Sequence, residues 1–142
     1  EMWRVLRPGG VLAARDSDYG AFTWAPAEPL LDRWLAIYRA VARRNGAEPD
    51  AGRFMRRWAL AAGLADVQIT SSTWTFADAE SCQWWGHLWA DRCELSGFAE
   101  QAVTYGLSSR DELGAIATAW RKWSAQPGAS FVVPHGEILA RA

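Results

Sequence analysis

The chain has 142 residues, half of them apolar, with a formal net charge of −1 and a pI near 6.1. This length suits one domain with a substantial core, and the charge balance gives no indication of a nucleic-acid partner or of an anionic membrane surface. No apolar run approaches the roughly 20 residues that a membrane-spanning helix needs, so no membrane partner is expected.

The first residues have the pattern of a helix that has already begun. Residues 1–7 space apolar and polar side chains as the last turns of a helix do, and Pro8-Gly9-Gly10 would end it. Residues 11–14 then predict a short apolar strand, closed by an acidic cluster with Asp16 and Asp18. We therefore expect the chain to start within a helix, with an earlier part missing.

Two helices and a strand are predicted next. Apolar residues recur at helical spacing from residue 30 to Arg44, after which Asn45-Gly46 ends the helix. Asp50 is a suitable N-cap for a second helix over residues 51–62, and Gly63 suits its C-terminal left-handed position. Residues 65–76 are rich in β-branched and aromatic residues and predict a strand.

The second half is mainly helical. Asp78 can cap a helix over residues 79–95, and a shorter helix over 97–105 is ended by Gly106. Ser109-x-x-Glu112 is a capping box that begins a third helix.

The last predicted strand covers residues 131–133, with 135–140 continuing it or pairing beside it. Pro134 indicates an edge position or a bulge. A short apolar first strand, helices between strands and later strands together predict the α/β class.

The two cysteines are not expected to form a disulfide. Cys82 and Cys93 fall on one predicted helix, which places them about 16 Å apart, whereas a disulfide needs Cα atoms within about 7 Å. Free thiols fit a cytoplasmic location. With only two histidines besides, no metal-ligand spacing is present.

Tryptophan is unusually frequent, with ten residues spread over the chain. Each indole can bury about 150–250 Å², so most are expected in the core. They are Trp3, Trp24, Trp34, Trp58, Trp74, Trp84, Trp85, Trp89, Trp120 and Trp123.

Three segments resemble class I S-adenosylmethionine-dependent methyltransferases. The stretch "RVLRPGGVLAARDSD" resembles the family's helix, Pro-Gly-Gly turn and fifth strand, and "GRFMRRWALAAGLADVQIT" resembles its later helix and sixth strand. The final "SFVVPHGEILARA" stands where the seventh strand is expected. The ubiquinone-biosynthesis-like (methyltransferase type 11) subgroup carries variable helices in the region between them.

The resemblance implies the C-terminal portion of one methyltransferase domain over residues 1–142, with strands five to seven of a Rossmann-like seven-stranded sheet and inserted helices. No G-x-G-x-G follows a strand, so the half that holds S-adenosylmethionine is expected to be absent. The remaining half would line the pocket for a small-molecule methyl acceptor. This fragment alone is expected to be inactive.

The acidic cluster is the first candidate catalytic group. Ligands of open α/β sheets lie beyond the carboxyl ends of the strands, and Asp16, Asp18 and Tyr19 occupy that end of the first strand. Asp16 or Asp18 could orient the acceptor or take its proton, with Tyr19 contacting it. The alternative is a loop with an Asx-turn and a helix cap.

Two further residues could bind the acceptor. Trp24 follows the same loop and could cover a pocket, or could pack on the helix over residues 30–44. Arg53 lies at a helix start, where a cation is unfavourable unless an acid meets it. It could hold an acidic acceptor or form an internal salt bridge with Asp50 or Asp18.

The run Trp84 to Trp89 is the most unusual stretch. Helical spacing places Trp85 and Trp89 on one side, where they could form an aromatic wall, with His87 as a proton acceptor. Alternatively, Trp85 and Trp89 are core residues and His87 is exposed.

Two non-catalytic alternatives stay open. One is a tryptophan-rich ligand-binding module that uses stacking and cation–π contacts, and the other is a dimerisation module. An uncovered sheet edge or apolar face also predicts self-association.

Overall fold

The computed structural model describes residues 1–2 and 4–141, so Trp3 and Ala142 lie outside it. The chain forms two compact units. Unit 1 combines Glu1–Phe22, Pro49–Trp74 and Val133–Ala142, and unit 2 combines Thr23–Glu48 and Thr75–Val132. Among the described helices, none has the length and apolar character needed to cross a membrane.

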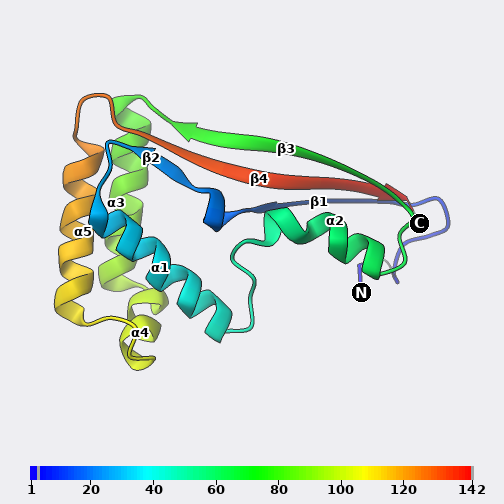
Figure 1. Ribbon diagram of the computed structural model, residues 1–142, viewed down its shortest axis with the longest axis horizontal. Coiled ribbons are helices and arrows are strands. Elements are labelled where there is room, and N and C mark those ends of the chain that lie inside the picture. The colour runs from blue at the N-terminus through cyan, green and yellow to red at the C-terminus, as the bar shows by residue number, and fades with distance from the viewer. Residues whose placement is uncertain (3, 142) are drawn as a thin grey trace. The chain divides into compact units, whose positions relative to one another are not determined.

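Unit 1 is a sheet with one helix. Its strands come from β1 (Val11–Ser17), β3 (Asp66–Phe76) and β4 (Ser130–Arg141), and β4 lies between β1 and β3 (Figure 1). The β1–β4 pairing is antiparallel, from Val11 opposite Arg141 to Ser17 opposite His135. A short 3-10 helix, η1 (Tyr19–Ala21), follows β1.

The helix α2 (Ala51–Ala61) packs on one face of this sheet. Because side chains alternate along a strand, Leu12, Ala14, Ile138 and Ala140 all point to that face. They meet the apolar side of α2 in one buried cluster that contains Met55, Ala59, Leu64, Val67, Leu12, Ala14, Ile138 and Ala140.

Unit 2 is mostly helical. It contains α1 (Pro29–Arg44), α3 (Ala79–Leu95), α4 (Gly97–Thr104) and α5 (Arg110–Ser124), and α3 and α5 run side by side (Figure 1). The short strand β2 (Thr23–Ala25) pairs antiparallel with residues 130–132 of β4.

An aromatic cluster forms the core of unit 2. Trp34 meets Trp89 and Trp120 edge to face at ring-centroid distances of 4.4 and 4.9 Å, and Trp123 meets Phe131 in the same way at 6.0 Å. These four tryptophans and Phe131 are fully buried. Edge-to-face contacts place positive ring edges against negative ring faces and stabilise the cluster beyond the area it buries.

Most indole N–H groups of this cluster have no conventional acceptor. The Nε1 atoms of Trp34, Trp85, Trp89 and Trp120 are buried without a hydrogen-bond partner in the described part of the chain, whereas Trp123 Nε1 donates to the Pro26 carbonyl at 3.1 Å. A ring face is a weak hydrogen-bond acceptor, and edge-to-face packing brings ring edges to ring faces in this core.

The mixed α/β class is confirmed, and the order of elements from the first strand onward is as predicted except for η1 and β2, which were not predicted. Gly46, Gly63 and Gly106 all take positive φ values where helices were expected to end. Asp78 caps α3 by accepting from the Ser81 backbone N–H at 2.9 Å.

The predictions for the first residues need correction. The described residues before Val11 form turns and no helix, although the Val5 backbone N–H donates to the Glu1 carbonyl in the helical pattern at 3.4 Å. The first strand is also longer than expected and includes Asp16. Antiparallel pairing with β4 continues to Ser17, and this long-range constraint is invisible in the local pattern.

The position of Pro134 also differs from expectation. The proline lies in a continuous strand that is paired on both sides, not at a sheet edge. It falls between the β4 residues that pair with β2, which end at Val132, and those that pair with β1, which begin at His135. The missing N–H of proline therefore costs no bond in either of these two ladders.

Two predicted caps are built differently. Asp50 is the N-cap residue of α2, but its side chain caps nothing there and accepts from the Gly20 backbone N–H instead. Ser109 caps α5 through the Glu112 N–H at 3.1 Å. The Glu112 carboxylate accepts from Arg33 at 2.7 Å, so half of the capping box is replaced by a tertiary ion pair.

The close contact between α3 and α5 gives a first test. A Cβ at Gly86 would lie 2.4 Å from Ser124 Cβ and 2.9 Å from the Trp120 carbonyl oxygen. Gly86→Ala should therefore lower the free energy of unfolding by about 1–3 kcal/mol, because the two helices must separate. Denaturant unfolding measures this change.

Gly114→Ala in α5 is the matched control. No atom lies within 4 Å of its added Cβ, so helix propensity alone should raise stability by about 0.5–1 kcal/mol. Equal effects of the two substitutions would contradict the assigned helix packing.

Candidate functional site

The carboxyl end of β1 lies close to one of the places where the chain leaves unit 1. The chain leaves unit 1 after Phe22, shortly beyond β1, and re-enters it finally at Val133 in β4. Because Ser17 pairs with His135, the end of β1 and the part of β4 near Val133 lie at the same end of the unit 1 sheet. Ligands of open α/β sheets bind at such strand ends.

Asp18 is held by Arg53. Its Oδ2 accepts from Arg53 Nε at 2.7 Å and its Oδ1 from Arg53 Nη2 at 2.6 Å, a bidentate pair. Asp18 is only 8% exposed. The pair meets the expectation that Arg53 forms an internal salt bridge, and it fixes the start of α2 against the end of β1.

Backbone bonds complete this connection. Asp50, which is also buried, accepts from the Gly20 N–H at 2.8 Å through Oδ1. The Tyr19 N–H donates to the Pro49 carbonyl at 3.1 Å, and the Tyr19 ring stacks on Phe22 at 4.3 Å. The loop after β1 is therefore bonded to the segment that begins α2.

Two glycines allow α2 to approach the sheet. A Cβ at Gly52 would lie 2.8 Å from both the Asp16 carbonyl oxygen and the Gly136 nitrogen, and a Cβ at Gly136 would overlap the Gly52 carbonyl. Gly136 is also the residue that pairs with Asp16. Only glycine fits at this close approach of backbone to backbone.

Asp16 differs from Asp18 because its carboxylate is exposed. Its Oδ1 accepts from the neighbouring Ser17 N–H at 2.8 Å. Asp16 also lines a pocket of about 620 Å³ between β1 and α2, whose other walls include Leu12, Met55 and Trp58. Of the two predicted carboxylates, Asp16 is thus the one that a ligand can reach.

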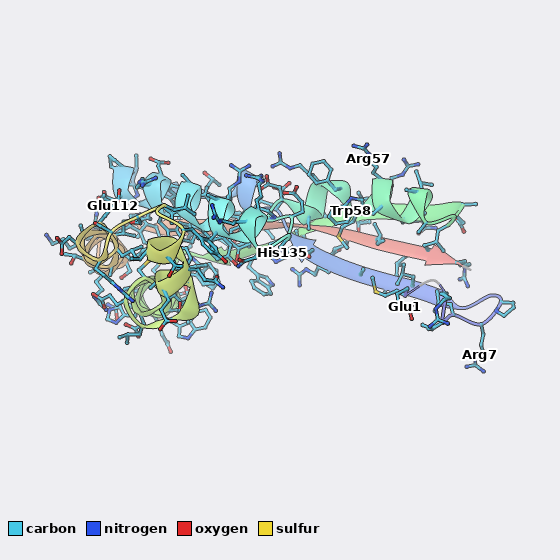
Figure 2. The ribbon with its side chains drawn as sticks, turned by 90° about the horizontal axis from the view of Figure 1, so that it is seen from below. Glu1, Arg7, Arg57, Trp58, Glu112 and His135 are labelled. Carbon is cyan, nitrogen blue, oxygen red and sulfur yellow. The ribbon has the colours of Figure 1, made fainter. Side chains whose placement is uncertain are left out.

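The other face of the sheet carries a polar cluster whose assembly from three strands no local sequence pattern predicted. Arg15, Ser72, His135 and Glu137 join there, and His135 lies beside the carboxyl end of β1 (Figure 2). These residues come from three strands, and Arg15 and His135 are 120 positions apart in the chain. Only the β4 pairing register, which local patterns do not specify, could have brought them together.

The remaining predicted site residues lie in unit 2. The Trp24 ring stacks on Phe131 at 5.5 Å, with the planes inclined by 6°. Trp85 and Trp89 are buried in the aromatic cluster, and Trp85 stacks on Phe76 at 4.4 Å. His87 is exposed on α3. These positions favour packing roles for Trp24, Trp85 and Trp89.

Neither cysteine suits a nucleophilic role. Cys82 and Cys93 are both free and buried, as expected from their spacing. Burial raises the pKa of the Cys93 thiol to about 12 and also raises the pKa of Cys82. Both thiols therefore stay protonated at neutral pH, and the thiolate is the reactive form.

Comparison with known proteins gives two relatives. The chain is 30% identical over 144 aligned positions to an uncharacterized methyltransferase of Schizosaccharomyces pombe, covering 98% of the chain and 50% of the relative. It is 26% identical to the probable methyltransferase ltbC of Aspergillus luteorubrus, covering 99% of the chain and 51% of the relative. This chain is related to methyltransferases. No protein-family model matches it, and the chain spans about half the length of the curated relatives it matches.

The contrast between the two carboxylates can be tested by stability. Asp18→Asn should lower the free energy of unfolding by about 1–3 kcal/mol, because it weakens two charge-assisted hydrogen bonds at a mostly buried position. Asp16→Asn is the matched control and should stay within about 0.5 kcal/mol of the original protein. Chemical denaturation of both variants decides between a structural Asp18 and two equivalent surface acids.

Proposed function

We propose that this chain is the acceptor-binding portion of an S-adenosylmethionine-dependent methyltransferase that acts on a small molecule. The observation that carries the proposal is the exposed Asp16 carboxylate at the carboxyl end of β1, in a chain whose relatives are named methyltransferases. This end of an open sheet is the usual place for a ligand.

The residues of this chain do not fit a site for the methyl donor. The described turns after β1 and β3 contain buried or capping acids, Asp18 and Asp78, and no glycine-rich loop lets the backbone approach a nucleotide there. We therefore propose that the donor is held by the part of the relatives that this chain does not span, and that residues 1–142 belong to one methyltransferase domain.

The unpaired edge of β1 supports the proposal that the methyl donor is held by a part of the protein outside this chain. In the described part of the chain β1 pairs with β4 alone, so its other edge has no strand partner. The pocket beside it, lined largely by apolar side chains, borders the same strand. An open strand edge next to apolar surface is expected where a sheet continues into further structure.

The chemistry that we assign to this chain is acceptor positioning. Asp16 would orient the acceptor nucleophile by accepting its hydrogen bond and would take its proton as the nucleophile attacks. Asp18 would act indirectly, since Arg53 engages both of its oxygens. Tyr19 stays a proposed acceptor contact. Trp24, Trp85 and Trp89 are less favoured because their rings pack on other aromatic rings, and His87 is exposed on α3.

We also propose self-association and a cytoplasmic location. Several large apolar side chains are exposed, among them Trp84 at 58% and Leu95 at 82%. Their exposure also supports the second candidate function, a dimerisation module without catalysis. Two free cysteines are consistent with a reducing compartment.

Asp16→Asn tests the proposed chemistry. The experiment uses a protein that contains this chain and spans the full length of its relatives. In this protein the substitution should lower kcat for methyl transfer by about 10²–10⁴-fold, as expected for loss of a general base. Affinity for S-adenosylmethionine, measured by calorimetry, should stay unchanged. Residues 1–142 alone should bind no S-adenosylmethionine. Unchanged turnover in the variant would remove Asp16 from the mechanism.

Self-association is tested by sedimentation. We expect the weight-average mass of residues 1–142 to rise with concentration, because exposed apolar surface drives association. Trp84→Lys should weaken this dependence if the outer face of α3 takes part. A single monomer mass over a hundredfold concentration range would contradict the proposal.

A further inference from the structure

Arg15, His135 and Glu137 connect β1 to β4 on the face opposite α2. Arg15 pairs with Glu137 in the register, and its Nε lies 3.3 Å from Glu137 Oε1. Arg15 Nη2 lies 3.3 Å from His135 Nδ1 and donates to Ser72 Oγ at 3.0 Å. The Arg15 guanidinium thus contacts His135 and Glu137 of β4 and Ser72 of β3.

Residues of β3 close the cluster. Ser72 donates its hydroxyl to Glu137 at 2.6 Å, and this bond lowers the pKa of the Glu137 carboxyl. The Trp74 ring lies 4.6 Å from the His135 ring and 5.2 Å from the Arg15 guanidinium. His135 is only 5% exposed as a result.

The contact between Arg15 and His135 is a hydrogen bond only when His135 is neutral. The guanidinium can only donate, so His135 Nδ1 must accept, which places the ring proton on Nε2. A protonated imidazole would turn Nδ1 into a donor that faces a second donor and a like charge. The contact between Arg15 and His135 is therefore lost when the ring takes up a proton.

The cluster lies directly behind the candidate site. Ser17 pairs with His135 and Asp16 with Gly136, and the Asp18 backbone N–H donates to the Pro134 carbonyl at 2.9 Å. The last residues of β1 are thus attached to residues 134–136 of β4. Side chains alternate along β1, so Arg15 points to one face while Asp16 points to the other.

We propose that neutral His135 is a positioning residue that holds the carboxyl end of β1, and that its protonation releases this end. The inference rests on the proposed function where it concerns turnover. The effect reaches Asp18 through the β1 backbone, whereas Asp16 also interacts with the imidazole through its charge.

The direction of the pH dependence follows from the surroundings of His135. Burial lowers its pKa, and the charge of Arg15 lowers it further, while a hydrogen bond to Val133 and the charges of Glu137 and Asp16 act in the opposite direction. An unfolded histidine has a pKa of about 6.5. Between this value and the lowered one the unfolded chain binds more protons, so stability is complete above about pH 6.5 and falls as the pH falls.

His135→Asn removes the titrating imidazole but keeps an acceptor for Arg15. The asparagine amide oxygen can accept from Arg15 near the place of Nδ1, and it does not titrate in this range. His135→Gln places its amide farther out, near Nε2, and should leave Arg15 without this acceptor at every pH. His87→Asn, which changes the exposed histidine, is the matched control for amide exchange.

Amide hydrogen exchange of Asp18 gives the readout. After correction for the intrinsic rate, protection in the original protein should fall at least about threefold between pH 7.5 and pH 5, since local opening becomes easier. His87→Asn should behave in the same way, and His135→Asn should show no such fall. Constant protection in the original protein, or an unchanged fall in His135→Asn, would overturn the proposal.

Turnover tests the functional part separately. In a protein that contains this chain and spans the full length of its relatives, kcat for methyl transfer should fall between pH 7.5 and pH 5, and His135→Asn should remove the fall in this range, with affinity for S-adenosylmethionine unchanged. If the same fall persists in His135→Asn, the positioning role is wrong. If no methyl transfer occurs at all, the proposed function fails, and the Asp18 exchange result still decides whether His135 holds β1.

Discussion

The pairing of β4 with its neighbours is the constraint on which unit 1 depends. β4 carries β1 along one edge and β3 along the other, so its register decides which side chains of all three strands meet. A shift by one residue would turn Ile138 and Ala140 away from α2 and place Glu137 in the apolar cluster. The apolar face against α2 therefore also fixes the polar cluster on the opposite face.

The same register makes the close approach of α2 possible. Gly136 lies opposite Asp16 at a place where the first turn of α2 touches the sheet backbone. Arg53 is one residue beyond Gly52, and this close approach brings its guanidinium to Asp18. The ion pair thus depends on a backbone contact that only glycine permits, which explains how a cation is tolerated in the first turn of a helix.

The sequence predicted what local chemistry determines. Helix ends at Gly46, Gly63 and Gly106 follow from the freedom of glycine at positive φ, and the unfavourable place of Arg53 indicated an acidic partner. It could not predict that β4 is paired on both edges or that Glu112 binds Arg33, because both depend on residues far along the chain. The joining of Arg15 and Ser72 with His135 and Glu137 was not predicted for the same reason.

The abundance of tryptophan is explained by packing in unit 2. Trp34, Trp89, Trp120 and Trp123 are fully buried, and their edge-to-face contacts make one connected aromatic core with Phe131. A binding module that stacks ligands would need exposed rings, and among the described tryptophans the exposed ones are Trp58, Trp74 and Trp84. Trp74 already contacts Arg15 and His135, and Trp58 stacks on Phe54. Tryptophan content alone therefore gives little support to a ligand-binding module, and the exposed carboxylate of Asp16 is the stronger functional indication.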